Sequence, residues 1–194
     1  MGPGRPRTVG DAAILRAAVE VIGRDGPGAL TLGAVAKEAG VVPGTLVQRF
    51  GSKRGLLLAI ARAGARAPVR FPRDGGSALA ALTAGIIASM APMDTPVAFA
   101  HHLAFLCMDL TDPEFHGFAL AAHEATGEAI AGLLGQALDE GELCPGTDVT
   151  ALAATVQAVA VGAGVTWALD RRSGLAARLT AQIEAVIAPH RETS

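Results

Sequence analysis

The chain has 194 residues, of which 51% are hydrophobic, 18% charged and 4% aromatic, and its formal net charge is −2. This apolar content excludes an intrinsically disordered chain, and the two cysteines exclude a small scaffold held together by disulfides. The length allows one ordinary domain, or a small domain joined to a larger one.

The first 40 residues predict two helices after a basic tail, residues 1–7. Apolar side chains then recur at the helical period until a Gly-Pro-Gly segment at 26–28 ends the first helix. Thr31 is a good N-cap for a second helix over Leu32–Ala39. Gly40 follows at the position where helices usually end.

Two further helices are predicted directly after this one. Pro43 suits the first turn of a third helix that runs to about Arg49, and Gly51 breaks it. Ser52 can cap a fourth helix, whose apolar residues again recur at the helical period.

The stretch 67–76 is rich in proline and glycine and is typical of a linker. The charge changes sign there, because residues 1–70 have a net charge of +7 and residues 71–194 a net charge of −9. A phosphate-binding module joined to one that avoids phosphate would have this distribution, although chance clustering of solvated charge would also give it. We predict two domains, residues 1–67 and residues 68–194.

Beyond the linker, five apolar stretches have the helical period. They cover roughly residues 77–91, 95–110, 113–140, 149–170 and 173–188. No clear alternating strand pattern is visible. The predicted fold is all-α with about nine helices, in which a C-terminal helical bundle follows the short N-terminal helices.

The segment TLGAVAKEAGVVPGTLVQRFGSKRGLLL, residues 31–58, has the pattern of a helix-turn-helix. In this motif the second helix lies in the major groove of DNA with its N-terminal end toward the base edges. Small residues at that end let the backbone approach the duplex, and helix N-termini favour phosphate. The residues predicted to contact DNA are Arg5, Arg7, Thr31, Pro43, Gly44, Thr45, Gln48, Arg49 and Lys53.

Residues 8–66 resemble the DNA-binding domain of the TetR family of transcriptional repressors. The resemblance is carried by TLGAVAKEAGV at residues 31–41, by GTL at 44–46, and by the pattern F-x-S-K-x-x-L at 50–56. It implies a homodimer that binds a palindromic operator and dimerises through its last two long helices. It also implies a small-molecule effector that releases the DNA.

Two positions depart from the family pattern. The family usually has serine as the N-cap of the recognition helix, and Val42 stands at that position here. Valine cannot make the side-chain capping bond, which is worth about 1 kcal/mol. The family usually has a tyrosine that meets a phosphate where Val47 stands, so the resemblance adds Val47 to the DNA-facing set. Arg49, where the family has His or Tyr, is then the side chain left to supply that contact.

The last two predicted helices are the candidates for dimerisation. One carries small residues every four positions, which make a flat ridge, and the other carries a stripe of large aliphatic residues. Paired with their symmetry mates they would form a four-helix bundle, although a monomeric core would use the same residues. The residues assigned to the interface are Ala154, Ala158, Gly162, Leu175, Leu179 and Ile183.

The middle helices concentrate aromatic, methionine and histidine side chains in a chain that is poor in aromatics. This pattern is typical of a ligand pocket, and plain core filling would also produce it. We expect an apolar or amphipathic effector there. The residues assigned to this pocket on the middle helices are Met90, Phe99, His102, Phe105, Met108, Phe118 and His123. Trp167, in the stretch 149–170, is assigned to the floor of the pocket, with the subunit interface as the alternative.

Other chemistry finds little support in the sequence. His116 and His123 lie two helical turns apart, too far to share one metal without a third ligand, so no metal site is assigned. A metal sensor that also uses His101, His102 or Cys107 is the alternative. The phosphate-loop, dinucleotide and nucleophile-elbow motifs are absent, and we expect neither a cofactor nor enzymatic activity.

Residues 149–169 and 75–93 carry no charge and are long enough to span a bilayer. Both are dominated by Ala, Gly and Thr, and neither is flanked by aromatic residues, so buried helices are the better interpretation. No secretory signal is visible near Met1. We expect a cytoplasmic protein without membrane contact.

The sequence therefore predicts a homodimeric, ligand-responsive transcriptional repressor that binds double-stranded DNA. The alternative, from a different class, is a helical small-molecule-binding or adaptor protein whose helix-turn-helix no longer reads DNA. The departures at Val42 and Val47 would permit it.

Overall fold

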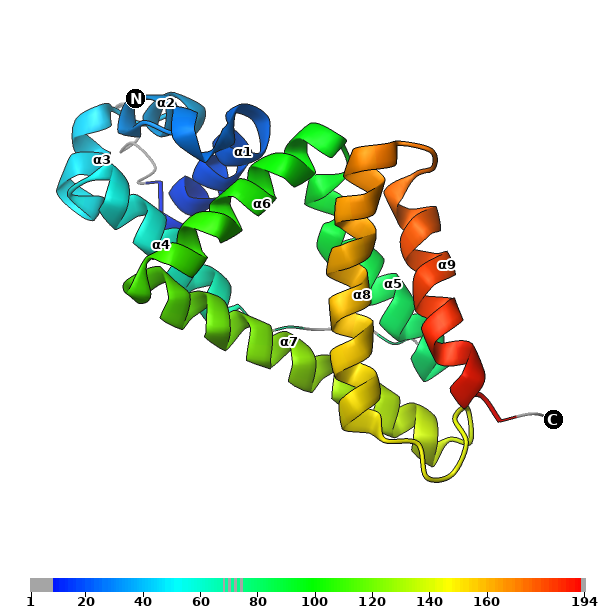
Figure 1. Cartoon of the computed structure of the whole chain (residues 1–194). Helices are drawn as coiled ribbons and strands as arrows, with labels where there is room; N and C mark the ends of the chain where they lie inside the picture. Colours follow the sequence, from blue (N-terminus) through cyan, green and yellow to red (C-terminus); the bar gives the residue numbers. More distant parts are fainter. Residues whose placement is uncertain (1–8, 68, 70, 72, 74, 193–194) are drawn as a thin grey trace, which may run out of the picture.

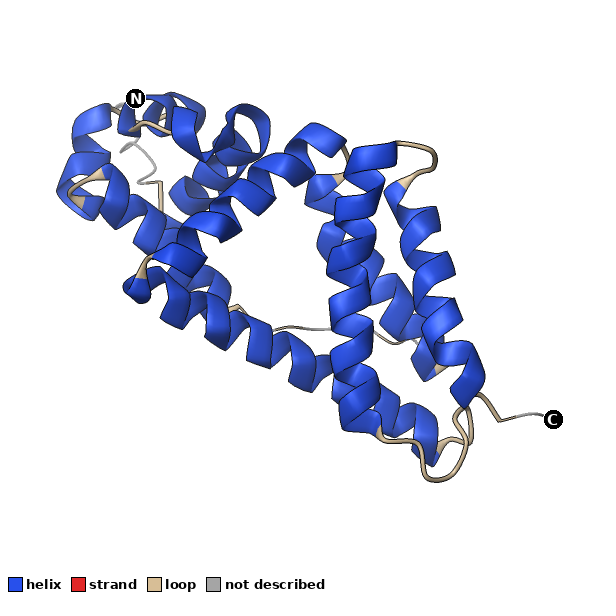
Figure 2. Cartoon of the chain, viewed as in Figure 1, coloured by secondary structure: helices blue, strands red, loops and turns tan. Residues whose placement is uncertain are grey.

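The computed structural model describes residues 9–67, 69, 71, 73 and 75–192. This part of the chain forms nine α-helices and two short 3-10 helices and contains no strand (Figure 2), which confirms the predicted all-α fold. The α-helices are α1 (Asp11–Ala29), α2 (Leu32–Glu38), α3 (Pro43–Phe50), α4 (Lys53–Arg66), α5 (Ala78–Met90), α6 (Pro96–Thr111), α7 (Pro113–Asp139), α8 (Val149–Asp170) and α9 (Leu175–Ile187) (Figure 1). The 3-10 helices are η1 (Ala91–Met93) and η2 (Ala188–His190).

Local signals in the sequence explain the ends of the first helices. Gly26 has a φ of +83°, which breaks the helical path inside α1 just before Pro27. The Thr31 hydroxyl accepts the backbone N–H of Ala34 at 3.0 Å, and the Ser52 hydroxyl caps the start of α4 in the same way. The predicted caps are confirmed.

The core consists of two hydrophobic clusters. The first is built by α1, α2, α3 and α4 and also includes Phe115 from α7. The second is built by α5 to α9. Helix α1 packs on α6 and α4 packs on α7, so these two contacts join the clusters. The boundary predicted after residue 67 follows α4 and stays a prediction.

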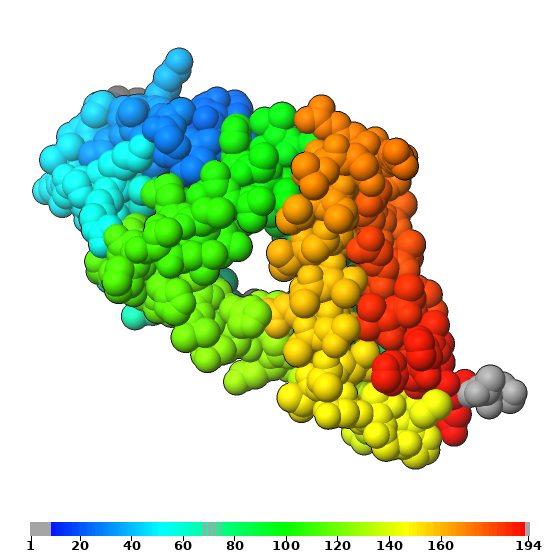
Figure 3. Space-filling view, in the orientation of Figure 1, coloured from blue at the N-terminus to red at the C-terminus, as the bar shows by residue number. Residues whose placement is uncertain are grey.

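The arrangement in space is open. Helices α6 and α7 run from the N-terminal helices to the rest of the molecule, where α8 and α9 lie side by side (Figure 1). The space-filling view is hollowed between α6, α7 and α8 (Figure 3). The fold therefore leaves concave surface near the middle helices.

Among the described helices, α8 is long and apolar enough to cross a membrane by length and composition. Helices α5 and α6 would pass the same test together, but the chain bends by 92° between them. In this fold α8 instead buries Leu152, Val156 and Trp167 in the second cluster. The amide Nε2 of Gln157 donates to the backbone carbonyl of His123 on α7 at 3.0 Å, which accounts for a polar residue within this apolar run.

Candidate functional site

The predicted helix-turn-helix consists of α2 and α3. Gly40 has a φ of +67°, and the backbone N–H of Val41 donates to the carbonyl of Ala36 at 2.9 Å, which closes the turn between the helices. Ala36 and Leu46 are buried, so each helix has one face in the first cluster. The opposite face of α3 is left at the surface.

The N-terminal end of α3 is exposed, at the end of the molecule far from α9 (Figure 1). Pro43, Gly44 and Gln48 are exposed and Thr45 is half-buried. The N-cap, Val42, makes no side-chain capping bond, as its residue type predicts. Exposed Val47 lies on this same face. The helix end predicted to meet DNA is therefore accessible.

Arg49 is bonded to the start of the first helix. Its Nη1 donates to the backbone carbonyl of Val9 at 2.6 Å and to Asp11 Oδ1 at 3.0 Å, and its side chain is only 24% exposed. These bonds hold the C-terminal end of α3 against the start of α1. Arg49 therefore positions α3, and its predicted contact with DNA stays a prediction.

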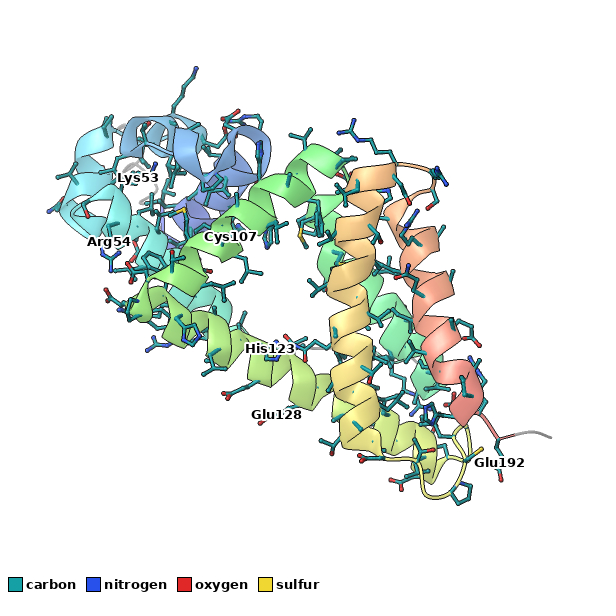
Figure 4. All side chains as sticks on the ribbon, viewed as in Figure 1. Lys53, Arg54, Cys107, His123, Glu128 and Glu192 are labelled. Atoms are coloured by element: carbon teal, nitrogen blue, oxygen red, sulfur yellow. The ribbon has the colours of Figure 1, made fainter. Side chains whose placement is uncertain are left out.

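The remaining predicted DNA contacts lie around α3. Thr31 is exposed at the start of α2 with its hydroxyl used in capping. The ammonium group of Lys53, labelled in Figure 4, donates to the backbone carbonyl of Gly28 at 3.0 Å. Arg5 and Arg7 lie outside the described residues.

A polar contact not predicted from the sequence joins α4 to α7. Arg54 Nη2 donates to Asp112 Oδ1 at 3.2 Å and to Glu114 Oε2 at 3.0 Å, and its guanidinium carbon lies 5.1 Å from the centre of the Phe115 ring. Hydrogen bonds from Arg54 lower the pKa of the Asp112 carboxyl below its ordinary value. These contacts of Arg54 hold the first turn of α7 against α4, next to the helix-turn-helix.

Several residues predicted to contact an effector are core residues instead. The rings of Phe99 and Trp167 meet edge to face with their centroids 6.4 Å apart, and both are buried in the second cluster. Met90 packs against the same cluster. The exposed ring of His123 contacts the Gln157 amide at 3.1 Å. Core packing or contact with α8 explains these four residues.

The other predicted effector residues lie at two concave surfaces. Met108 lines a small pocket between α4, α6 and α7. His102, Phe105 and Phe118 line a larger groove of about 900 Å³ whose walls come from α1, α4, α6 and α7. We call this the α4–α6 groove. Its size is within the range of small-molecule sites.

The sequence interpretation missed the α1 and α4 side of this groove and one acidic residue on α6. Asp109 lines the groove, is 7% exposed, and its Oδ1 has no hydrogen-bond partner among the described residues. Burial raises the pKa of its carboxyl to about 6. Asp109 is the only charged residue in α6, a signal that the sequence already contained.

The surfaces of α8 and α9 correct part of the predicted dimer interface. The α9 residues assigned to it, Leu175, Leu179 and Ile183, are buried within the protomer's own second cluster. Packing against α5 and α8 requires the aliphatic stripe of α9, so these side chains are not free to face a partner. The small residues of α8, by contrast, are all exposed: Ala154, Ala158 and Gly162.

Within the described residues, no group of three His, Cys, Asp or Glu side chains could hold a metal ion. His101 Nδ1 lies 2.9 Å from the backbone carbonyl of Gly23, so this ring serves the contact between α6 and α1. Cys107, labelled in Figure 4, is exposed.

Residues 14–60, which span α1 to α4, match the family of bacterial regulatory proteins of the tetR type. No curated protein matches the chain. The sequence match thus covers the helix-turn-helix and the helices that support it.

Solved structures extend the likeness to more than nine-tenths of the chain. A Rhodococcus sp. protein described as a TetR-family transcriptional regulator is 27% identical, with a TM-score of 0.68 over 91% of this chain and 97% of that chain. A regulator from Saccharomonospora viridis in complex with choline is 17% identical, with a TM-score of 0.73 over 94% and 98%. The regulator FadR from Bacillus subtilis, in complex with stearoyl-CoA, is 20% identical, with a TM-score of 0.66 over 91% and 97%. Residues 14–60 thus match the tetR family of bacterial regulatory proteins over α1 to α4, and about nine-tenths of the chain shares the fold of a TetR-family regulator that is 27% identical.

Proposed function

We propose that the chain is a transcriptional repressor that binds a palindromic operator as a homodimer and leaves it when a small molecule binds. The observation that carries the proposal is the exposed N-terminal end of α3, where Gly44 and Gln48 are exposed and Thr45 is half-buried. A duplex can approach this end, and the major groove admits a helix of this kind. Residues 1–67 would bind DNA, and residues 68–194 would dimerise and bind the effector.

The dimer is supported by the exposed surface of α8. Ala154, Ala158 and Gly162 leave a flat strip where a partner helix can come close, and beside it Val161 and Leu169 are 46% and 79% exposed. Two operator half-sites about one turn of DNA apart require two recognition helices, which a symmetric dimer supplies.

Effector control is supported by the α4–α6 groove and by the relatives. The groove has walls on both the helix-turn-helix side and the C-terminal side, so a ligand there would contact both. Solved relatives hold choline or stearoyl-CoA. If the effector weakens operator binding, the operator must weaken effector binding by the same factor. The protein would act in the cytoplasm without catalysing a reaction.

A salt titration of binding to a palindromic promoter fragment tests the proposal. Specific binding should be about a thousandfold tighter than binding to random DNA of equal length, and should weaken steeply as salt rises. Equal affinity for the two DNAs would instead favour the helical small-molecule-binding or adaptor protein. The missing cap at Val42 and the internal use of Arg49 are the features that favour this second candidate.

Gln48→Ala is expected to weaken operator binding by about 1–3 kcal/mol and to relax preference at particular base pairs, because the exposed amide can read a base edge. Binding to random DNA should change little. The measurement is a competition assay over single-base operator variants. Gln182→Ala on α9 is the control, and an equal loss on random DNA would show that Gln48 contacts the backbone instead.

Ala158→Glu is expected to convert the dimer to a monomer and to reduce operator affinity, because it puts a charge into the proposed strip on α8. Sedimentation velocity measures the oligomer. Ala84→Glu, at an exposed position of α5, should leave the dimer intact. A dimer that persists in Ala158→Glu would move the interface elsewhere.

A further inference from the structure

We propose that the α4–α6 groove binds an organic cation with an apolar body, such as a protonated alkylamine, and that Asp109 holds its positive charge. The claim that this cation is the effector rests on the proposed function, whereas the claim that the groove binds it does not. The ligand class follows from the chemistry of the groove itself.

Each of the four helices contributes apolar side chains to the walls of the groove. Leu15 and Ile22 of α1, Ile60 of α4, Phe105 of α6 and Phe118 of α7 are among them. Such a surface favours a hydrocarbon or aromatic body, and its size suits a small organic molecule better than an inorganic ion.

Asp109 is the polar feature that the fold does not account for. Its side chain is more than nine-tenths buried, and Oδ1 has neither a hydrogen-bond partner among the described residues nor contact with solvent. Buried polar groups nearly always have partners, so an unpartnered carboxyl at a groove marks a missing ligand.

Three other charged or titratable side chains line the groove, namely Arg16, Glu20 and His102. No hydrogen bond or ion pair joins Asp109 to any of them. Arg16 and Glu20 lie four residues apart on α1 and carry opposite charges, so their effects on a ligand oppose each other. Asp109 is therefore the uncompensated charge. Its raised pKa of about 6 agrees with this, and an ammonium group beside it would favour the ionised form.

The position of the groove gives the cation a route to DNA binding. A ligand between α1 and α4 on one side and α6 and α7 on the other would change how these helix pairs pack. Helix α4 packs on α3 and Arg49 bonds α3 to the start of α1, so the orientation of α3 would change with them. The cation should therefore weaken operator binding.

Three probes with the same phenylbutyl body separate charge from apolar fit: 4-phenylbutylamine, 4-phenylbutan-1-ol and 4-phenylbutanoate. Calorimetric titration at pH 7.5 of the full chain should give the order amine, then alcohol, then acid. Asp109→Asn should reduce amine affinity about ten- to hundredfold and leave the alcohol nearly unchanged. Glu128→Gln, at an exposed position of α7 outside the groove lining, is the matched control and should keep the amine preference.

Equal affinity of the unmodified protein for the three probes, or tightest binding of the acid, would overturn the proposal. So would an equal loss of amine and alcohol in Asp109→Asn. Ala63→Phe, at an exposed position of the groove wall, adds bulk to the groove and should weaken both the amine and the alcohol. Unchanged binding in Ala63→Phe would mean that the probes bind elsewhere.

Operator binding measured without any probe keeps the two proposals apart. A chain that binds its operator but shows no amine preference remains a regulator with a different ligand. A chain that prefers the amine but does not bind DNA specifically would keep the cation site and lose the repressor function.

Discussion

Gly55→Ala is expected to lower the free energy of unfolding by about 3 kcal/mol and the Tm by roughly 10 °C. A Cβ at this position would lie 2.0 Å from the carbonyl oxygen of Phe50, far inside the contact distance. That oxygen also accepts the backbone N–H of Ser52 at 2.8 Å, so it belongs to the tight joint between α3 and α4. A backbone atom in such a joint cannot move aside as a side chain can.

The measurement is thermal unfolding followed by circular dichroism, with operator affinity as a second readout. Operator binding should fall with stability, because the same joint holds the C-terminal end of α3. Gly132→Ala on α7 is the matched control: its added Cβ meets no atom within 4 Å, and alanine should stabilise that helix by about 0.5–1 kcal/mol. If both variants melt at the same temperature, the joint is more compliant than its geometry indicates.

The helices could be predicted from the sequence because their signals are local. Thr31 and Ser52 accept bonds from residues three positions ahead, and Gly26 and Gly40 adopt backbone angles that favour glycine. Each such signal lies within a few residues of the helix end it determines. The N-terminal end of α3 was likewise predictable, because Pro43 lies at the helix end that it determines.

The groove and the role of Arg49 could not be predicted, because they depend on contacts between distant parts of the chain. Arg49 pairs with Asp11, which is 38 residues away, and the groove combines α1 and α4 with α6 and α7. The helical period of Leu175 and Leu179 predicts that their face of α9 is buried. It does not predict whether the same protomer or a partner covers that face. Tertiary packing decides all three.

Asp109→Asn is expected to stabilise the ligand-free protein by about 1–3 kcal/mol at pH 7.5 and to have little effect at pH 3.5. Burial raises the pKa of this carboxyl from 3.8 to about 6, so between these values the folded chain keeps a proton that the unfolded chain has released. The contribution of Asp109 to the free energy of unfolding is therefore most favourable below about pH 4, where its carboxyl is protonated in both states. That contribution is lost as the pH rises through about 6. Asparagine has nearly the same shape and never acquires the buried charge.

Denaturant unfolding of both proteins at several pH values between 3.5 and 7.5 measures this difference. The gap between the two curves should open mainly from about pH 4 to pH 6. Asp94→Asn, at an exposed position after η1, is the control and should give a curve parallel to that of the unmodified protein. A constant gap at every pH would mean that the substitution changes packing and not charge.

The same experiment links stability to the proposed ligand. The buried negative charge that destabilises the free protein at pH 7.5 is the charge that an ammonium group would neutralise. Saturating 4-phenylbutylamine should therefore stabilise the unmodified protein more at pH 7.5 than at pH 4.5, where Asp109 is largely neutral. Asp109→Asn should remove this dependence on pH, because its side chain is uncharged at both values.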